Sequence, residues 1–321
     1  MKYRPLGKSG LMVSEIAFGA WAIGGSMWGG RRDEEARAAL ARARQLGVNF
    51  IDTALVYGDG HSERLVGEFV RSNPGMMVAT KVPPKSMQWP ARANARLEDN
   101  FPGDWIRASC ERSLANLGLE RIDLLQLHVW AEAWTDSDEW YDAMVRLKEE
   151  GKIRLVGISI NSHDPASAVR VARSGRVDAL QVFYNVFDQS PEDELFPTCL
   201  EHGVGVLSRV PLDEGSLTGK FTESTQFPRG DFRRDYFRGP LLAETVRRVQ
   251  ALRPVLTGPS GATTMARGAL RFCLSHKAVS TVIPGMRSAA QAEENCAASE
   301  DGALPAEVID GLRAHRWVRG G

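Results

Sequence analysis

Short apolar segments alternate with amphipathic ones along most of the chain. The apolar segments are near-continuous hydrophobic runs, which is typical of parallel strands that are buried on both faces. They predict eight strands, at Glu15–Gly19, Asn49–Asp52, Met77–Lys81, Ile122–His128, Ile153–Ser159, Ala179–Tyr184, Gly205–Arg209 and Ser280–Pro284. Helical spacing between them is clearest at Glu34–Leu46, Glu63–Val70, Trp105–Leu117 and Trp140–Glu150.

Eight strand–helix pairs in alternation favour a (β/α)8 TIM barrel, an α/β fold. Ser62 is expected to cap the helix that follows it. Glycines are expected just past the helix ends, at Gly47, Gly118, Gly151, Gly175 and Gly203. The first residues predict an N-terminal β-hairpin whose Gly-Lys-Ser-Gly turn is suited to plug the bottom of the barrel. A long loop, Val210–Thr264, follows the seventh strand and is expected to clamp a substrate or cofactor. Because no shift in composition divides the chain, one barrel domain over residues 1–321 is expected.

Composition excludes several classes of partner. The chain has 40 basic and 40 acidic residues, so nothing favours nucleic acid or an anionic membrane surface. No apolar stretch approaches the roughly 18 residues of a membrane span, and the N-terminus lacks the apolar core of a signal peptide, so a cytoplasmic protein is expected. The cysteines are widely spaced and no His/Asp cluster has ligand spacing, so no metal site is expected. The oligomeric state stays open.

Ionisable residues stand at the ends of several predicted strands. Asp52, Lys81 and His128 close three of them, and Tyr57 lies on the loop after Asp52. Because the carboxyl ends of barrel strands converge on one face, these four side chains are expected to meet. Tyr57 would protonate a carbonyl oxygen if the ammonium of Lys81, held by Asp52, lowered its pKa from about 10. His128 would orient the carbonyl or share the proton. The group predicts an enzyme that reduces aldehydes or ketones.

Six segments of the chain resemble the aldo-keto reductases. They are FIDTALVYGDGHSE, ATKV, DLLQLH, EEGKIRLVGIS, PLDEGSLTGK and VIPGMR, in the family's order and over almost the whole chain. The resemblance implies a (β/α)8 barrel and a nicotinamide cofactor bound in an extended form without a Rossmann fold. It also implies a catalytic tetrad, which falls on Asp52, Tyr57, Lys81 and His128.

The resemblance further implies where the cofactor lies. Gly19, Ala20 and Trp21, with Asp52, fall beside the nicotinamide, and its carboxamide ligands are Ser159 and Gln181. The segment that folds over the pyrophosphate contributes Pro211, Leu212, Glu214, Gly215, Ser216 and Lys220. The adenosine end is assigned to Gly285, Met286, Arg287, Gln291, Glu294 and Asn295. Because Arg287 is suited to paired hydrogen bonds with a 2′-phosphate, NADPH/NADP is expected rather than NADH.

Two positions depart from the family's pattern. Ile160 follows Ser159 where the family often has Asn, so the carboxamide loses a ligand unless Asn161 reaches in. Arg209 stands where many members have an aromatic residue against the nicotinamide. Its guanidinium either stacks on that ring, disfavouring the oxidised cofactor, or turns away to pair with a phosphate or a carboxylate.

Aromatic residues near the strand ends predict the substrate pocket. Its lining is expected to include Trp21, Tyr57, His128 and Trp130, with Trp89 and Phe237 as further candidates. Such walls favour an apolar or aromatic carbonyl compound. The expected function is therefore NADPH-dependent reduction of an aldehyde or ketone to an alcohol. Two alternatives stay open: an NAD(P)-dependent sugar or alcohol dehydrogenase, and a cofactor-binding regulatory subunit with little turnover.

Overall fold

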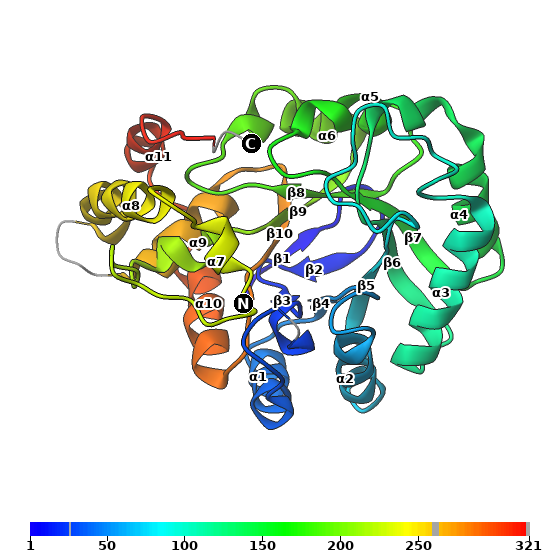
Figure 1. Cartoon of the computed structure of the whole chain (residues 1–321), viewed down its shortest axis with the longest axis horizontal. Coiled ribbons are helices and arrows are strands. Elements are labelled where there is room, and N and C mark those ends of the chain that lie inside the picture. Colours follow the sequence, from blue (N-terminus) through cyan, green and yellow to red (C-terminus); the bar gives the residue numbers. More distant parts are fainter. Residues whose placement is uncertain (26, 259–262, 319–321) are drawn as a thin grey trace.

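Eight parallel strands form one sheet that curves into a barrel, with helices packed around its outside (Figure 1). The computed structural model describes residues 1–25, 27–258 and 263–318. Around the barrel, each strand pairs with the next one in the chain. Bridges from Ile16 to Val282 and from Gly19 to Gly285 link the first strand to the last. The (β/α)8 barrel predicted from the sequence is confirmed.

The strand bounds agree closely with the apolar runs. The barrel strands are β3 (Phe18–Gly19), β4 (Phe50–Asp52), β5 (Met77–Val82), β6 (Ile122–Leu127), β7 (Ile153–Ser159), β8 (Ala179–Phe183), β9 (Gly205–Arg209) and β10 (Val279–Ile283). The first barrel strand is shorter than predicted, since only Phe18 and Gly19 of the expected run pair with β4.

The helices form the outer layer. They are α1 (Asp33–Gln45), α2 (His61–Arg71), α3 (Gly103–Leu117), α4 (Asp138–Glu149), α5 (Val169–Arg173), α6 (Leu195–His202), α7 (Arg233–Tyr236), α8 (Leu241–Thr257), α9 (Met265–Ser275), α10 (Ala289–Asp301) and α11 (Ala306–Arg313). Short 3-10 helices lie at η1 (Ala22–Gly24), η2 (Glu132–Asp136), η3 (Pro165–Ala168), η4 (Ser190–Glu192) and η5 (Asp213–Thr218).

The expected helix ends are partly confirmed. All five glycines predicted to follow helices have a positive φ, the backbone conformation that ends a helix most easily. The prediction for Ser62 is wrong, because α2 already begins at His61. The Ser62 hydroxyl instead donates to the carbonyl oxygen of Ala20 and bonds the hydroxyl of Thr53, both at 2.8 Å. It thereby ties α2 to the ends of two barrel strands.

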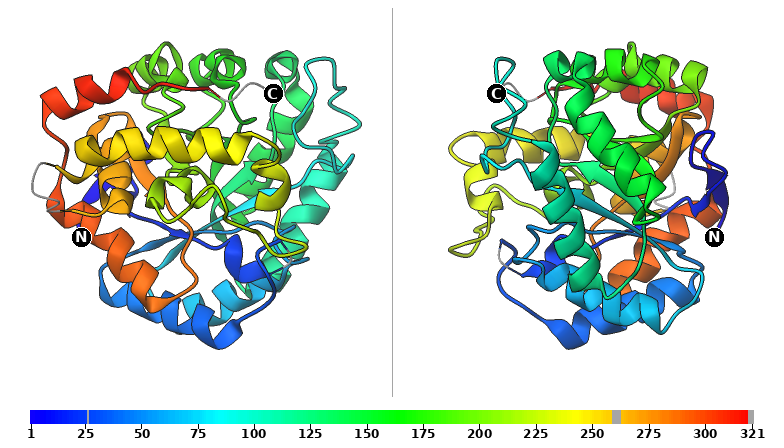
Figure 2. Two further views of the ribbon diagram at one scale, coloured as in Figure 1. Left: turned by 60° about the vertical axis from the view of Figure 1, so that its left-hand side comes forward. Right: turned by 90° about the vertical axis from the view of Figure 1, so that its right-hand side faces the viewer.

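The N-terminal hairpin closes one end of the barrel. Its strands β1 (Tyr3–Pro5) and β2 (Met12–Ser14) pair antiparallel, as expected. Leu6 and Leu11, on either side of its turn, are buried in a cluster that includes residues from inside the barrel. The hairpin and the long connection after β9 lie at opposite ends of the molecule (Figure 2, right). Because the hairpin plugs the amino ends of the strands, the carboxyl ends are left for a site.

The long connection after β9 is more regular than expected. The sequence predicted one loop over Val210–Thr264, but α8 fills much of its second half. The irregular part before α8 contains η5 and α7, and its phenylalanines Phe221, Phe227 and Phe237 pack edge-on or stacked on one another. Residues 259–262 of this range lie outside the described residues. No helix in the described part of the chain is long and apolar enough to cross a membrane.

Gly67→Ala should destabilise the protein, because α2 and α3 touch at this position. A Cβ on Gly67 would lie 2.0 Å from the carbonyl oxygen of Leu117, which is backbone and cannot rotate away. We expect a loss of about 1–3 kcal/mol in the free energy of unfolding, measured from urea denaturation. Gly311→Ala in α11 is the matched control, since nothing lies within 4 Å of its added Cβ. Equal unfolding midpoints for the two variants would contradict the close approach.

Candidate active site

The carboxylate of Asp52, at the end of β4, is the centre of the site. Its Oδ2 accepts a hydrogen bond from Nζ of Lys81 on β5, at 2.7 Å, and its Oδ1 accepts one from the amide of Gln181 on β8, also at 2.7 Å. The amide of Gln126 on β6 reaches the same Oδ1 at 3.3 Å. Four barrel strands therefore converge on one buried carboxylate, which fixes the positions of their side chains.

Lys81 connects this carboxylate to the phenol of Tyr57. The Lys81 side chain is fully buried, and its Nζ also donates to the carbonyl oxygen of Thr53 at 2.8 Å and to the Tyr57 oxygen at 3.4 Å. Burial opposes the ammonium charge, but Asp52 and then Tyr57 outweigh it, so the pKa of Lys81 is raised. The structure therefore places a cation beside the phenol, as the sequence predicted.

The expected lowering of the Tyr57 pKa is wrong in its net direction. Burial raises the pKa of Tyr57 above its usual value, and the opposing effect of Lys81 offsets this only in part. The sequence shows which charged residues are present but not how much water the fold removes from the phenol. Tyr57 is consequently protonated at neutral pH and has a proton to give.

His128 is held neutral at the edge of the same group. Burial, then the charges of Lys81 and Arg209, lower its pKa well below the usual value. Its ring lies edge-on to Tyr57, with the centroids 6.0 Å apart, and edge-on to Trp89. The indole N–H of Trp89 donates to the carbonyl oxygen of His128 at 3.1 Å. The four side chains predicted from the strand ends thus meet at one point.

Several polar atoms at this end of the barrel are buried without a hydrogen-bond partner among the described residues. They include Nδ1 of His128, Nε of Arg209, Oε1 of Gln126 and Nε1 of Trp28. Buried polar groups in native proteins are nearly always paired, so a cluster of unpaired ones indicates a place for a ligand. Gln126 was not predicted from the sequence, although it stands two residues before His128 on the same side of β6.

The two expected carboxamide ligands lie next to the tetrad. The Ser159 hydroxyl, at the end of β7, donates to Oε1 of Gln181 at 3.3 Å. Through Gln181 the pair is joined to Asp52. Asn161 does not reach in as a replacement for the missing family Asn. Its amide is engaged with both backbone groups of Ala91 and with the carbonyl oxygen of Trp130.

The expected phosphate loop has a strained backbone. Val210, Asp213 and Glu214 all have φ between 47° and 56°, which residues with side chains seldom adopt. Strain of this kind is often stored at ligand sites. Gly215 and Gly219 also have positive φ. The hydroxyl of Ser216 is buried and donates to the carboxylate of Asp213 within the same segment. Lys220 is exposed.

The expected adenosine end is built around Arg287 and Trp28. Arg287 Nη1 donates to the carbonyl oxygen of Trp28 at 2.8 Å, and its guanidinium lies 5.7 Å from the Trp28 ring. Burial, then the nearby Arg233 and Arg32, lower its pKa. Of the other residues assigned here, Met286 is buried, and the amide of Asn295 donates to the carbonyl oxygen of Gly285. Gln291 accepts a hydrogen bond from the backbone N–H of Arg287, and Glu294 forms an ion pair with Arg267.

The β3 loop and the connection after β9 meet over this end of the barrel. The Trp21 ring lies against Tyr57, Trp28 and Phe232, at centroid distances of 6.0, 5.3 and 4.7 Å. Arg233, on α7, lies 4.8 Å from the Trp28 ring. Gly19, which bridges Gly285, and Ala20 lie directly below, at the end of β3. These contacts were not predicted, because sequence periodicity does not reveal where two loops meet.

The prediction that Trp130 lines the substrate pocket is wrong. Its side chain is fully buried between Trp134 and Trp140, and its indole N–H donates to Ser167. Trp130 stands just after a strand, where side chains can reach the site, but its ring packs against residues of η2 and α4 instead. Phe237 is likewise buried. Trp89, by contrast, is 42% exposed beside His128.

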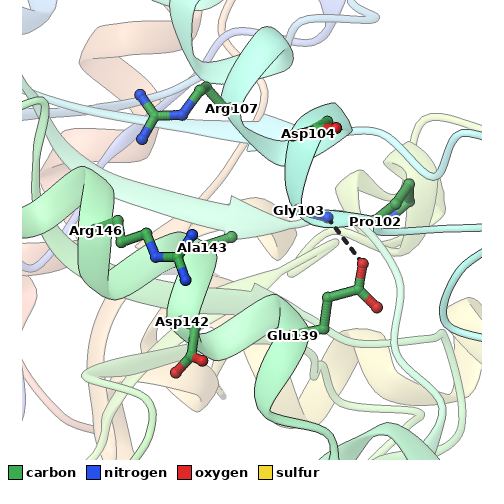
Figure 3. A pocket seen from close by; sticks show the side chains of 8 residues that line it. All are labelled: Pro102, Gly103, Asp104, Arg107, Glu139, Asp142, Ala143 and Arg146. Carbon is green, nitrogen blue, oxygen red and sulfur yellow. Dashed lines mark hydrogen bonds between the residues drawn. The ribbon is translucent and has the colours of Figure 1, made fainter.

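A shallow groove also lies on the outer wall, between α3 and α4 (Figure 3). Its lining residues are Pro102, Gly103, Asp104, Arg107, Glu139, Asp142, Ala143 and Arg146. They come from two outer helices and include none of the tetrad, so this groove is separate from the strand-end site. Within the described part of the chain, no group of three or more His, Cys, Asp or Glu side chains is arranged to hold a metal ion.

Comparison with known proteins gives a consistent result. The family model described as "Aldo/keto reductase family" matches residues 15–316. The chain is 29% identical over 298 residues to the aldo-keto reductase YhdN of Bacillus subtilis, covering 91% of this chain and 87% of that protein. It is 28% identical over 312 residues to the NADH-specific methylglyoxal reductase of Escherichia coli, covering 93% of each.

A solved structure is similar over almost the full length. The holo form of the aldo-keto reductase AKR11C1 from Bacillus halodurans superimposes with a TM-score of 0.77 at 29% identity. The match covers 98% of this chain and 96% of that one.

The stability of the protein should depend on pH through His128. The native ring stays neutral below pH 6.5, whereas the unfolded ring takes up a proton there, so acid favours the unfolded state. Relative to His128→Asn, the wild type should lose about 1 kcal/mol of unfolding free energy between pH 7 and pH 5.5. Urea denaturation of both proteins at each pH measures the difference, and parallel pH profiles would show that His128 is not held neutral.

Proposed function

The chain belongs to the aldo/keto reductase family, and we propose that it reduces an aldehyde or ketone to an alcohol with NADPH. The observation that carries the proposal is the contact of a protonated phenol, Tyr57, with a buried ammonium, Lys81, beside a neutral histidine. A phenol in that setting can give up its proton to an oxygen that is gaining negative charge. The overall change is carbonyl compound, NADPH and a proton to alcohol and NADP⁺.

Each side chain of the tetrad has a separate task in this proposal. The cofactor supplies the hydride that goes to the carbonyl carbon. Tyr57 donates its proton to the carbonyl oxygen, and the Lys81 ammonium, 3.4 Å away, stabilises the phenolate that remains. Asp52 keeps Lys81 charged and in place. His128, being neutral, holds the carbonyl oxygen by a hydrogen bond without competing as a strong acid.

The residues around the tetrad fit a dinucleotide cofactor. The buried indole nitrogen of Trp28, which lies against Arg287, has no hydrogen-bond partner among the described residues. Ser159 and Gln181 would hold the carboxamide next to Asp52, and the strained segment from Pro211 to Lys220 would cover the phosphates. The residue set thus supports binding of a nicotinamide cofactor.

The choice of NADPH over NADH rests on Arg287. After burial, Arg233 and Arg32 lower its pKa, Asp231 and Glu35 oppose them, and each of those arginines is itself paired with one of those carboxylates. Arg287 has no ion pair among the described residues. A guanidinium without a carboxylate partner is suited to pair with a 2′-phosphate. One relative is named an NADH-specific reductase, so cofactor preference differs among the relatives and has to be measured for this chain.

Tyr57→Phe should remove the proton donor and leave the cofactor site intact. We expect kcat for an activated aromatic aldehyde with NADPH to fall by roughly 10²–10⁴-fold, followed by nicotinamide absorbance. The Kd for NADPH, measured by fluorescence quenching, should change little. Tyr141→Phe on α4, away from the site, is the matched control.

Three results would lead away from this function. Unchanged turnover in Tyr57→Phe would remove Tyr57 as the acid. Much faster oxidation of sugars or alcohols than reduction of carbonyls would favour a dehydrogenase. Tight NADPH binding by the wild type without turnover in either direction would favour a cofactor-binding regulatory subunit.

Arg287→Ala should weaken NADPH selectively. Because the lost guanidinium would pair with the 2′-phosphate, we expect the Kd for NADPH to rise about tenfold or more and that for NADH to change by less than about threefold. Equilibrium titrations with both cofactors measure the two constants. Arg173→Ala, on the exposed face of α5, controls for a general loss of positive charge. Equal weakening of the two cofactors by Arg287→Ala would disprove the assignment.

A further inference from the structure

Arg209 ends β9 and reaches into the space beside the tetrad. Its Nη2 donates to the carbonyl oxygen of Ile160 and to the hydroxyl of Ser162, both at 3.1 Å. The guanidinium lies 5.4 Å from the ring centroid of Phe183. These contacts fix the plane of the guanidinium but engage only one of its three nitrogens.

The charge of Arg209 has no carboxylate partner within ion-pair distance among the described residues. None of the ion pairs in that part of the chain involves it. Its Nε is buried and has no hydrogen-bond partner there. Desolvation of an unpaired cation is costly, and an anion that completes the pair is bound strongly for the same reason. The protein thus holds a guanidinium in place without a carboxylate in direct contact among the described residues.

Burial lowers the pKa of Arg209, and Tyr57, Glu214, Asp52 and Tyr236 are the groups whose charges raise it against that effect. Lys81 is neutralised by Asp52 at 2.7 Å. Tyr57 is protonated, and His128 is neutral with a pKa that Arg209 itself helps to lower. Glu214 raises the pKa of Arg209, and no ion pair joins the two side chains among the described residues. The guanidinium therefore lies close enough to act on the residues that would handle the carbonyl oxygen, and it makes no direct ion pair among the described residues.

We propose that Arg209 binds a carboxylate on the carbonyl substrate, so that the preferred substrates are oxo acids. This inference rests on the proposed reductase function and names its substrate class. Nε and Nη1 of Arg209 would donate to the carboxylate, while Tyr57 and His128 take the carbonyl oxygen. Charged hydrogen bonds of this kind are about twice as strong as neutral ones.

The remaining wall of the cleft favours an apolar body between the two polar groups. Trp89 is 42% exposed and packs edge-on against His128. A substrate that spans these residues and Arg209 would combine an aromatic or aliphatic chain with one carboxylate. The expectation from the sequence was an apolar or aromatic carbonyl compound, and the proposal adds a carboxylate to it.

The test compares substrates that differ only in charge. The pairs are 4-formylbenzoate with its methyl ester and phenylglyoxylate with its methyl ester, which carry the carboxylate far from and next to the carbonyl. The readout is the acid-to-ester ratio of kcat/KM with NADPH, for the wild type and for Arg209→Met. Taking the ratio for each protein cancels both the different reactivity of the esters and any general effect of the substitution.

We expect Arg209→Met to lower this ratio about tenfold or more for at least one pair, as the loss of one charged hydrogen-bonded contact predicts. Arg209→Lys, which keeps the charge, should retain more of the ratio than Met. Raising the ionic strength should lower the wild-type ratio and leave that of Arg209→Met unchanged. Arg92→Met removes an exposed arginine from the β5–α3 loop and should leave the ratio as in the wild type.

Failure of this inference and failure of the proposed function give different results. Equal acid-to-ester ratios in the wild type and Arg209→Met, with turnover of the esters, would overturn the carboxylate site and leave the reductase standing. An equal loss of ratio in Arg92→Met would also overturn it, since general surface charge would then be the cause. An unchanged ratio with a raised Kd for NADPH would assign Arg209 to the cofactor. No turnover of either member of a pair by the wild type would overturn the function itself.

Discussion

The ion pair between Lys81 and Asp52 determines the arrangement of the site. A fully buried ammonium is tolerated only where an opposite charge and further acceptors surround it, and here Asp52 and the Thr53 carbonyl supply them at 2.7 and 2.8 Å. The carboxylate is in turn held by amides from β6 and β8. Removing either charge would leave the other unpaired inside the barrel, so neither position can change alone without a large loss of stability.

The same pair sets the chemistry of Tyr57 through a balance of opposing effects. Burial favours the neutral phenol, whereas Lys81 and Arg209 favour the phenolate. The net effect is a protonated phenol whose conjugate base is still stabilised by two cations. Both requirements of a proton donor are met: the proton is present before the reaction, and the charge left behind is accommodated. A surface tyrosine would meet only the first.

The barrel and the tetrad could be predicted from the sequence because both depend on strand ends. An apolar run of four to seven residues that closes on Asp52, Lys81 or His128 fixes the position of that residue along the barrel axis and its distance from the bottom plug. Predictions failed where the direction of a side chain mattered. Trp130 follows a strand as closely as other site residues do, but it packs outward against Trp134 and Trp140. Contacts between distant loops, such as Trp28 with Arg233, leave no periodic signal.

Arg209 departs from the family's pattern at the end of β9, and the proposed substrate class depends on this departure. An aromatic ring at the end of β9 would add an apolar surface to the cleft, whereas the guanidinium adds a charge and directional donors. Ile160 and Ser162 orient that guanidinium through one nitrogen, and Phe183 supports its face. In the proposed site the proton donor would be the same in either case, and the residue beside it would set the charge of the preferred substrate. Specificity can change at this position without any change in the ion pair on which the tetrad depends.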